Sequence, residues 1–169
     1  MSILVYIESN QNQIKKSSFE SLSYAKKLSK LISLDVIAVV INCSELAPLS
    51  DFGPDKIISV NEKKLETFNA HNYADVISNV SKSVSAKNII ISDSINCKYL
   101  ASLLSVKLNA AFVSNVVSLP NSTNPFVVKR STFSNKAFCE IEINSEIRIL
   151  SISKNSIGLN ENKSVPIII

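Results

Sequence analysis

Residues 87–119, KNIIISDSINCKYLASLLSVKLNAAFVSNVVSL, carry the pattern that decides the fold. An apolar run over 88–91 is followed by a polar loop, an amphipathic helical pattern over 97–109 and a second apolar run over 111–119. Strand, loop, helix and strand in this order form a β-α-β unit, whose two strands lie parallel in one sheet. The stretch therefore predicts an α/β domain.

The same alternation precedes this stretch. Ser17, with Glu20 three residues later, predicts a capping box at the start of a first helix, and Asn72 is predicted to cap a second one. Together the units predict a Rossmann-like, three-layer α/β/α fold with a mostly parallel sheet. Further strands are predicted at 3–7, 35–41 and 56–60.

After Pro120 the pattern changes to short runs of alternating polarity, which is typical of half-exposed antiparallel strands. Asn135 is predicted in a tight hairpin turn, because asparagine tolerates positive φ. Residues 154–169 lack periodicity, so the domain is predicted over 1–153 with 154–169 as a tail or the start of a linker. The predicted C-terminal antiparallel strands are 126–133, 137–144 and 147–153.

Composition excludes several classes of protein. A chain of 169 residues with 46% hydrophobic and 19% charged residues is long enough for one folded domain. No apolar run approaches the roughly 20 residues of a membrane helix, so membrane insertion is not expected. The first residues lack the features of a signal peptide, and we expect a cytoplasmic, bacterial protein. The net charge of +4 comes from scattered lysines, which argues against nucleic-acid binding.

Glycine is scarce, and this limits nucleotide binding. Gly53 and Gly158 are the only two glycines. Dinucleotide sites and P-loops need several glycines close together, because the backbone must approach the phosphates closely. A self-contained site of either kind is therefore excluded.

The polar loop within the opening stretch holds the candidate ligand-binding residues. Ser92, Asp93, Ser94 and Asn96 follow a predicted strand, at the edge where open α/β sheets bind ligands. The weak cofactor-binding candidates are Ser92, Asp93 and Asn96. The alternative is that the loop caps the next helix and contacts a partner.

Lys98, Lys129 and Arg130 are candidate partner-interface residues. Lys129 and Arg130 are consecutive on a predicted strand, so their side chains point to opposite faces. Lys98 lies in the first turn of a helix, where the helix dipole disfavours a cation. Plain solvent exposure of all three is the alternative.

No catalytic residue or metal ligand is assigned. His71, the one histidine, has no partner that would make it a general base. Glu140 and Glu142 lie two residues apart and share one exposed face of a predicted strand. Neither these two nor Glu146 have further ligands nearby at the spacing of a metal site. Free thiols are expected at Cys43, Cys97 and Cys139.

Several segments, in the right order, resemble one family. They are ILVYIE (3–8), KKSSFESLSYAKKL (15–28), the stretch 89–119, VVKRSTFSNKAFCEIEI (127–143) and ISKNS (152–156). Together they are similar to the N-terminal domain of the α subunit of electron transfer flavoproteins. The family usually has glycine where this chain has Asn109 and Asn135, and asparagine is the commonest replacement at left-handed positions.

The resemblance implies a domain with the adenine nucleotide alpha hydrolase-like fold in a heterodimer of α and β subunits. The complete complex would carry FAD, held mainly by a second α domain, and its β subunit would hold AMP or a second FAD. It would accept electrons from flavin dehydrogenases, such as the acyl-CoA dehydrogenases of fatty acid beta-oxidation, and pass them toward a quinone reductase. No part of this chain matches the FAD domain's glycine- and arginine-containing signature, so we expect no FAD on it.

Within this resemblance, the domain would be a scaffold and docking surface, an electron-carrier component without an active site of its own. The alternative is a free-standing nucleotide-binding module of the stress-protein-like α/β type. Measurable affinity for adenine nucleotides would distinguish the two.

Overall fold

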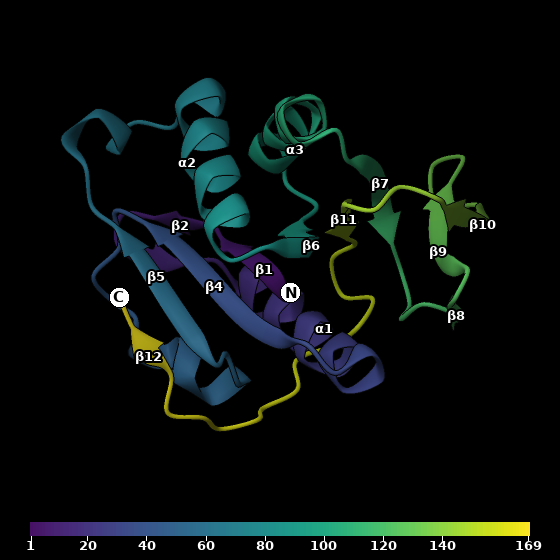
Figure 1. Cartoon of the computed structure of the whole chain (residues 1–169), viewed down its shortest axis with the longest axis horizontal. Helices are drawn as coiled ribbons and strands as arrows, with labels where there is room; N and C mark the ends of the chain where they lie inside the picture. Colours follow the sequence, from purple (N-terminus) through teal and green to yellow (C-terminus); the bar gives the residue numbers. More distant parts are fainter.

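A computed structural model describes residues 1–169, and it shows an α/β domain built on one large sheet (Figure 1). The sheet order is β10-β9-β7-β11-β6-β1-β4-β5-β12, with β8 paired to β9. The α-helices are α1 (Lys16–Ile32), α2 (Ala70–Ser83) and α3 (Ile95–Leu108), and the 3₁₀ helices are η1 (Ala47–Phe52) and η2 (Lys63–Leu65). The strands are β1 (Ser2–Ile7), β2 (Ser9–Asn10), β3 (Gln13–Ile14), β4 (Asp35–Ile41), β5 (Lys56–Val60), β6 (Ala86–Ser92), β7 (Ala111–Val116), β8 (Ser122–Thr123), β9 (Phe126–Thr132), β10 (Ala137–Ile143), β11 (Arg148–Ile152) and β12 (Ile167–Ile168).

Helices cover both faces of the parallel part of the sheet, which confirms the three-layer prediction. Figure 1 shows α2 and α3 side by side, and both pack into the same apolar core with one face of the sheet. α1 packs into a second core on the opposite face. Alternate residues of β1 enter the two cores, because successive side chains of a strand point to opposite faces: Ile3, Val5 and Ile7 join α1, and Leu4 and Tyr6 join α2 and α3.

The predicted antiparallel pairing of the third C-terminal strand, 147–153, is wrong. β9 and β10 form the expected antiparallel hairpin. β11 instead runs parallel between β6 and β7, in the middle of the sheet. Its residues Ile149, Leu150 and Ile152 are buried, since both faces of this position are covered. A continuous apolar run is what a doubly covered parallel strand requires.

Both predicted helix caps are wrong by a few residues. α1 begins after Lys15, which makes no side-chain cap, and the carboxylate of Glu20 accepts a hydrogen bond from the backbone N–H of Asn155 at 2.9 Å. Ser17 therefore has no capping box. The cap of α2 is Asn69, whose side-chain oxygen accepts from the N–H groups of His71 and Asn72, so Asn72 lies inside the helix.

Asparagine supplies left-handed backbone at two positions, as predicted. Asn109 ends α3 with φ 48°, and Asn135 lies in the β9–β10 turn with φ 63°. The fold is thus compatible with the scarcity of glycine. Gly53 is a position at which the fold does require glycine, because a Cβ here would lie 2.7 Å from the carbonyl oxygen of Asn162.

Residues 154–169 are not a detached tail. The backbone N–H of Asn155 and that of Asn160 donate to side chains of α1, and the segment then passes η1 (yellow in Figure 1). It ends in β12, which pairs parallel to β5 and extends the sheet. Hydrogen bonds to α1 and β5 therefore tie it to the domain, although its sequence shows no periodicity. Its predicted role as the start of a linker stays a prediction.

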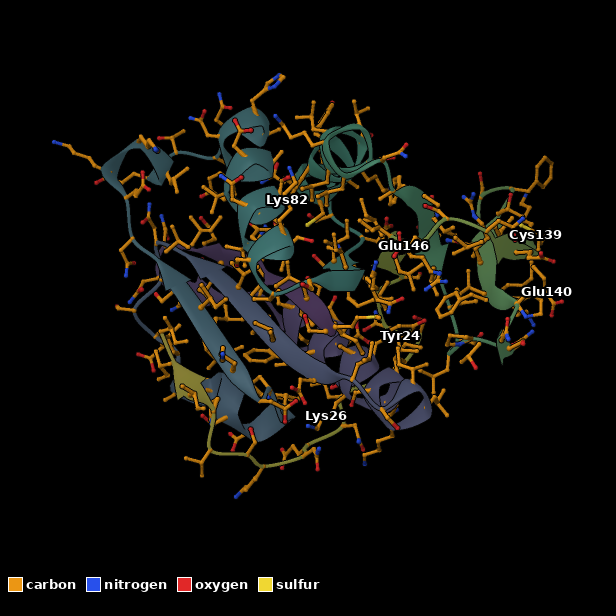
Figure 2. All side chains as sticks on the ribbon, viewed as in Figure 1. Tyr24, Lys26, Lys82, Cys139, Glu140 and Glu146 are labelled. Carbon is orange, nitrogen blue, oxygen red and sulfur yellow. The ribbon has the colours of Figure 1, made fainter.

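Replacement of Tyr24 by phenylalanine is expected to stabilise the domain. Tyr24 is fully buried between α1 and the sheet (Figure 2), and its hydroxyl has no hydrogen-bond partner in the protein. Because a buried unsatisfied hydroxyl costs about 1–3 kcal/mol, Tyr24→Phe should raise the free energy of unfolding by about 1 kcal/mol in urea titrations. Tyr73→Phe is the matched control, since its hydroxyl donates to the Leu65 carbonyl at 2.9 Å and its loss should destabilise. Destabilisation by both variants would contradict the assignment.

The same variant should change the response to alkali. Burial raises the pKa of Tyr24 above its ordinary value of about 10. As the pH rises past about 10, the unfolded state loses this proton first. The contribution of this group to the free energy of unfolding is therefore fully present below about pH 10 and is lost as the pH rises further. Tyr24→Phe has no phenol to titrate, so its free energy of unfolding, measured in urea titrations at several pH values, should fall less steeply above about pH 10.

Candidate functional site

The order of the strands places a topological switch point between β1 and β6. From β1 the chain passes through α1 to β4 and then to β5, and it returns through α2 to β6 on the other side of β1. Open α/β sheets bind ligands in the crevice that this reversal opens at the carboxyl ends of the strands. Glu8 directly follows β1, and Ser92 is the last residue of β6.

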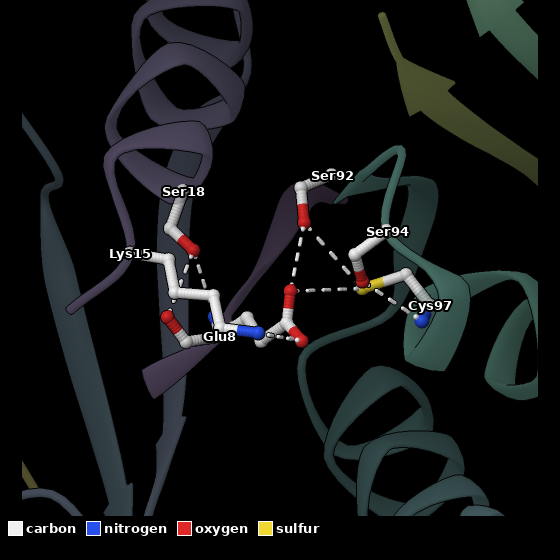
Figure 3. Close-up of polar contacts among 6 residues, drawn as sticks. All are labelled: Glu8, Lys15, Ser18, Ser92, Ser94 and Cys97. Carbon is white, nitrogen blue, oxygen red and sulfur yellow. Dashed lines mark hydrogen bonds and ion pairs between the residues drawn. The ribbon is translucent and has the colours of Figure 1, made fainter. Parts of the chain in front are cut away.

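Polar side chains of this chain contact one another at this switch point (Figure 3). Glu8 is 3% exposed, and its carboxylate forms an ion pair with Lys15 Nζ at 2.7 Å. The hydroxyl of Ser92 donates to Glu8 Oε2 at 3.3 Å, and Cys97 Sγ lies 3.9 Å from the same oxygen. The backbone of Glu8 is held by Ser18, whose hydroxyl accepts from its N–H and donates to its carbonyl. We call Glu8, Lys15, Ser18, Ser92 and Cys97 the switch-point cluster.

Cys97 in this cluster is not set up for thiolate chemistry. Burial raises the pKa of its thiol, and hydrogen bonds with Ser92 and Ser94 offset the effect only in part. Reactive cysteines have lowered pKa values in electropositive surroundings, whereas this thiol faces the Glu8 carboxylate. The cluster is therefore built to pack and to bond internally.

The space left beside the cluster is small. A cavity of about 160 Å³ lies among the β2–β3 hairpin, the end of β4 and α2, and Asn96 lines it. Sites for small molecules and cofactors usually measure about 300–1,000 Å³. Lys15 and Glu66 both line the cavity, so it carries no excess of positive charge that would favour a phosphate. It is smaller than the sites that usually hold cofactors.

A second, larger hollow of about 480 Å³ lies at the same edge of the sheet, beside β7 and the β9–β10 turn. It brings together three of the predicted site residues, Asp93, Lys98 and Arg130. We call it the sheet-edge hollow. Its lining residues are Asp93, Lys98, Asn115, Arg130, Thr132, Phe133, Ser134, Asn135, Ser153 and Lys154.

Asp93 is held by residues of its own chain. One carboxylate oxygen accepts from the Ser151 hydroxyl at 2.9 Å, and the other lies 3.4 Å from Lys98 Nζ. Ser94 caps α3 by accepting from the N–H of Cys97 at 3.1 Å. The helix-capping alternative for this loop is thus observed, while ligand binding by Asp93 stays a prediction.

The other residues that the sequence analysis considered, of which Lys129 was a candidate and the rest were assigned no role, lie away from both sites. Lys129 projects from β9 with its ammonium group 4.7 Å from the centre of the Phe138 ring. Glu140 is on the outer strand β10, far from the helices (Figure 2). Glu146 pairs with Lys87, and His71 lies exposed at the start of α2. No three His, Cys, Asp or Glu residues converge to hold a metal.

Sequence reasoning missed Glu8, Lys15 and Lys154. For Glu8 a signal was present, because an acidic residue directly after an apolar first strand lies at the ligand-binding edge of the sheet. Lys15 and Lys154 reach their positions through loops, and no local pattern marked them.

Comparison with known proteins identifies the family. Residues 3–168 match the family model described as electron transfer flavoprotein domain. The chain belongs to this family. It is 24% identical over 162 residues to the electron transfer flavoprotein subunit alpha of Bacillus subtilis (strain 168), covering 94% of this chain and 49% of that protein. It is 25% identical over 145 residues to the subunit of the same name from Syntrophomonas wolfei subsp. wolfei, covering 84% of this chain and 44% of that protein.

The electron transfer flavoprotein domain described here spans about half the length of the curated relatives that it matches. None of its helices is both long and apolar enough to cross a membrane.

Proposed function

We propose that this chain is the N-terminal domain of an electron transfer flavoprotein α subunit and acts as a scaffold and docking surface. In the complete complex, electrons would pass from flavin dehydrogenases, including acyl-CoA dehydrogenases of fatty acid beta-oxidation, toward a quinone reductase. The domain would be an electron-carrier component and not an enzyme. Family membership and the two α-subunit relatives support the placement.

The observation that carries the scaffold role is the filled switch point. The crevice in which this fold class binds ligands holds the Glu8–Lys15 ion pair and the side chains of Ser92 and Cys97. The same observation speaks against the alternative of a free-standing, stress-protein-like nucleotide-binding module.

The outer face of α3 supports docking of a partner. Ile95, Tyr99 and Val106 lie on one side of the helix and are 75%, 67% and 83% exposed. A helix that is apolar on its outer as well as its inner face is typical of a buried position. We propose that the β subunit of the heterodimer covers this face. FAD would then belong to the complete α/β complex, with AMP or a second FAD in the β subunit, and the complex would be cytoplasmic.

The isolated chain is expected to be colourless. Calorimetric titration of the Arg130→Gln variant with FAD, AMP and ATP should show no saturable binding, because the switch-point cluster occupies the crevice and the substitution removes a cation of the sheet-edge hollow. In a second arm, the tagged chain should co-purify with a co-expressed electron transfer flavoprotein β subunit. Tyr99→Asp should reduce that yield, while Lys82→Asp on α2 should not.

Either of two results would contradict the proposal. One FAD or one adenine nucleotide per chain, bound even by the Arg130→Gln variant, would favour the nucleotide-binding module. Loss of the β subunit with Lys82→Asp but not with Tyr99→Asp would place the docking surface elsewhere.

A further inference from the structure

The sheet-edge hollow carries an excess of positive charge that the chain itself does not neutralise. Asp93 is its only acidic residue, and both carboxylate oxygens are already engaged by Ser151 and Lys98. The other two cations of the lining, Arg130 and Lys154, form no ion pair with any carboxylate. Two uncompensated cations thus share one hollow.

Arg130 in particular lacks acceptors. One of its terminal nitrogens donates to the Ser114 hydroxyl at 3.1 Å, and no carboxylate of the chain pairs with its guanidinium. A half-buried guanidinium that lines a hollow and is short of acceptors is best satisfied by an oxyanion. Arg130 lies on β9 and its register partner is Val116 on β7, so the guanidinium is carried by the sheet and not by a mobile loop.

The rest of the lining is polar and rich in groups that can donate hydrogen bonds. Hydroxyls come from Thr132, Ser134 and Ser153, amides come from Asn115 and Asn135, and Phe133 is the one apolar residue. The segments that contribute them are far apart in sequence and meet where β7, β9 and β11 end. A carboxylate has two oxygens to satisfy, whereas a phosphate has three and carries more charge, so this number of donors suits phosphate better.

We propose that the sheet-edge hollow binds the phosphate group of a small, polar phosphate ester. Arg130 and Lys154 would contact the phosphate, and the hydroxyls and amides would complete its hydrogen bonds. The volume of about 480 Å³ lies in the range of small-molecule sites and exceeds what a bare phosphate needs. Apart from Phe133 the remaining lining is hydrophilic, so the group attached to the phosphate is a polyol or sugar, not an apolar chain. This site is separate from the filled switch point and does not depend on the electron-transfer role.

The test is calorimetric titration of the whole chain with ribose 5-phosphate, inorganic phosphate and ribose. We expect saturable binding of ribose 5-phosphate, weaker binding of inorganic phosphate and none of ribose. Arg130→Gln and Lys154→Gln should each weaken binding about tenfold or more, because each removes a charge-assisted hydrogen bond. Lys129→Gln is the matched control: it removes the same charge from the neighbouring residue, whose side chain lies over Phe138 on the other face of β9, and it should leave binding unchanged.

Thermal unfolding of each variant shows whether it is folded, and Arg130→Lys, which keeps the charge, should retain part of the affinity. Equal affinity for inorganic phosphate and ribose 5-phosphate would identify free phosphate as the ligand. Absence of binding by both phosphates, or equal weakening by Lys129→Gln, would overturn the proposal. If both phosphates fail to bind and Arg130→Gln prevents co-purification with the β subunit, the hollow is a protein contact and the proposal is wrong.

Discussion

Leu104→Ala is expected to lower the free energy of unfolding by about 2–5 kcal/mol, one of the two largest effects that we predict. Leu104 lies on α3 and is fully buried in the core that α2 and α3 form with the sheet. The substitution removes apolar contacts and leaves a cavity that the close-packed core around Leu104 fills only in part. Urea unfolding followed by circular dichroism measures the change.

Val106→Ala is the matched control on the same helix. Val106 is 83% exposed, so its truncation removes little buried surface from the isolated domain and should change stability by about 0.5 kcal/mol or less. Equal destabilisation by both variants would mean that α3 is not oriented as described. Because Val106 belongs to the proposed docking face, its variant also separates an effect on folding from an effect on assembly.

The sequence predicted α3 and the parallel strands well because their signals are local. Leu100, Leu104 and Leu108 recur at the helical period, and the apolar run of β4 has the length of a central strand. The pairing of β11 could not be read in this way. Its insertion between β6 and β7 depends on contacts between residues far apart in the chain, and a five-residue run does not state which strands lie beside it.

The two wrong caps have a common physical cause. Serine and asparagine favour a helix start wherever the backbone allows it, but several such residues lie close together near each start. Tertiary contacts then decide among them. Glu20 bonds to Asn155 and leaves Ser17 without its capping box, and Asn69 supplies the cap expected from Asn72.

Part of the site followed from topology alone. The carboxyl-end rule placed Ser92 and Asp93 at the correct edge of the sheet. Adjacent side chains on an extended segment point in opposite directions, but the sequence does not state which residue points which way. The rule therefore could not show that Ser92 turns toward Glu8 while Asp93 turns toward Lys98. The convergence of Arg130 with Lys98 was equally hidden, since β9 reaches this edge only after the chain reverses direction.

Glu8→Ala is expected to lower the free energy of unfolding by about 2–3 kcal/mol. Removing one partner of a buried ion pair costs about 3–5 kcal/mol, and Lys15 is partly exposed, which reduces the loss. The variant also leaves the Ser92 hydroxyl without its carboxylate acceptor. Glu8→Gln, which keeps an oxygen that can accept from Ser92 and loses the charge, should fall between the wild type and Glu8→Ala.

Glu62→Ala is the surface control, because Glu62 forms an ion pair of the same 2.7 Å length with Lys64 in the open and should cost less than about 1 kcal/mol. A double-mutant cycle of Glu8→Ala with Lys15→Ala then isolates the pair, and we expect a coupling of about 1–2 kcal/mol. A coupling near zero would show that the cost of Glu8→Ala comes from packing alone. A clear coupling would show that the ion pair at the switch point stabilises the domain. The edge at which this fold class binds ligands would then serve here to hold the end of β1 to the start of α1.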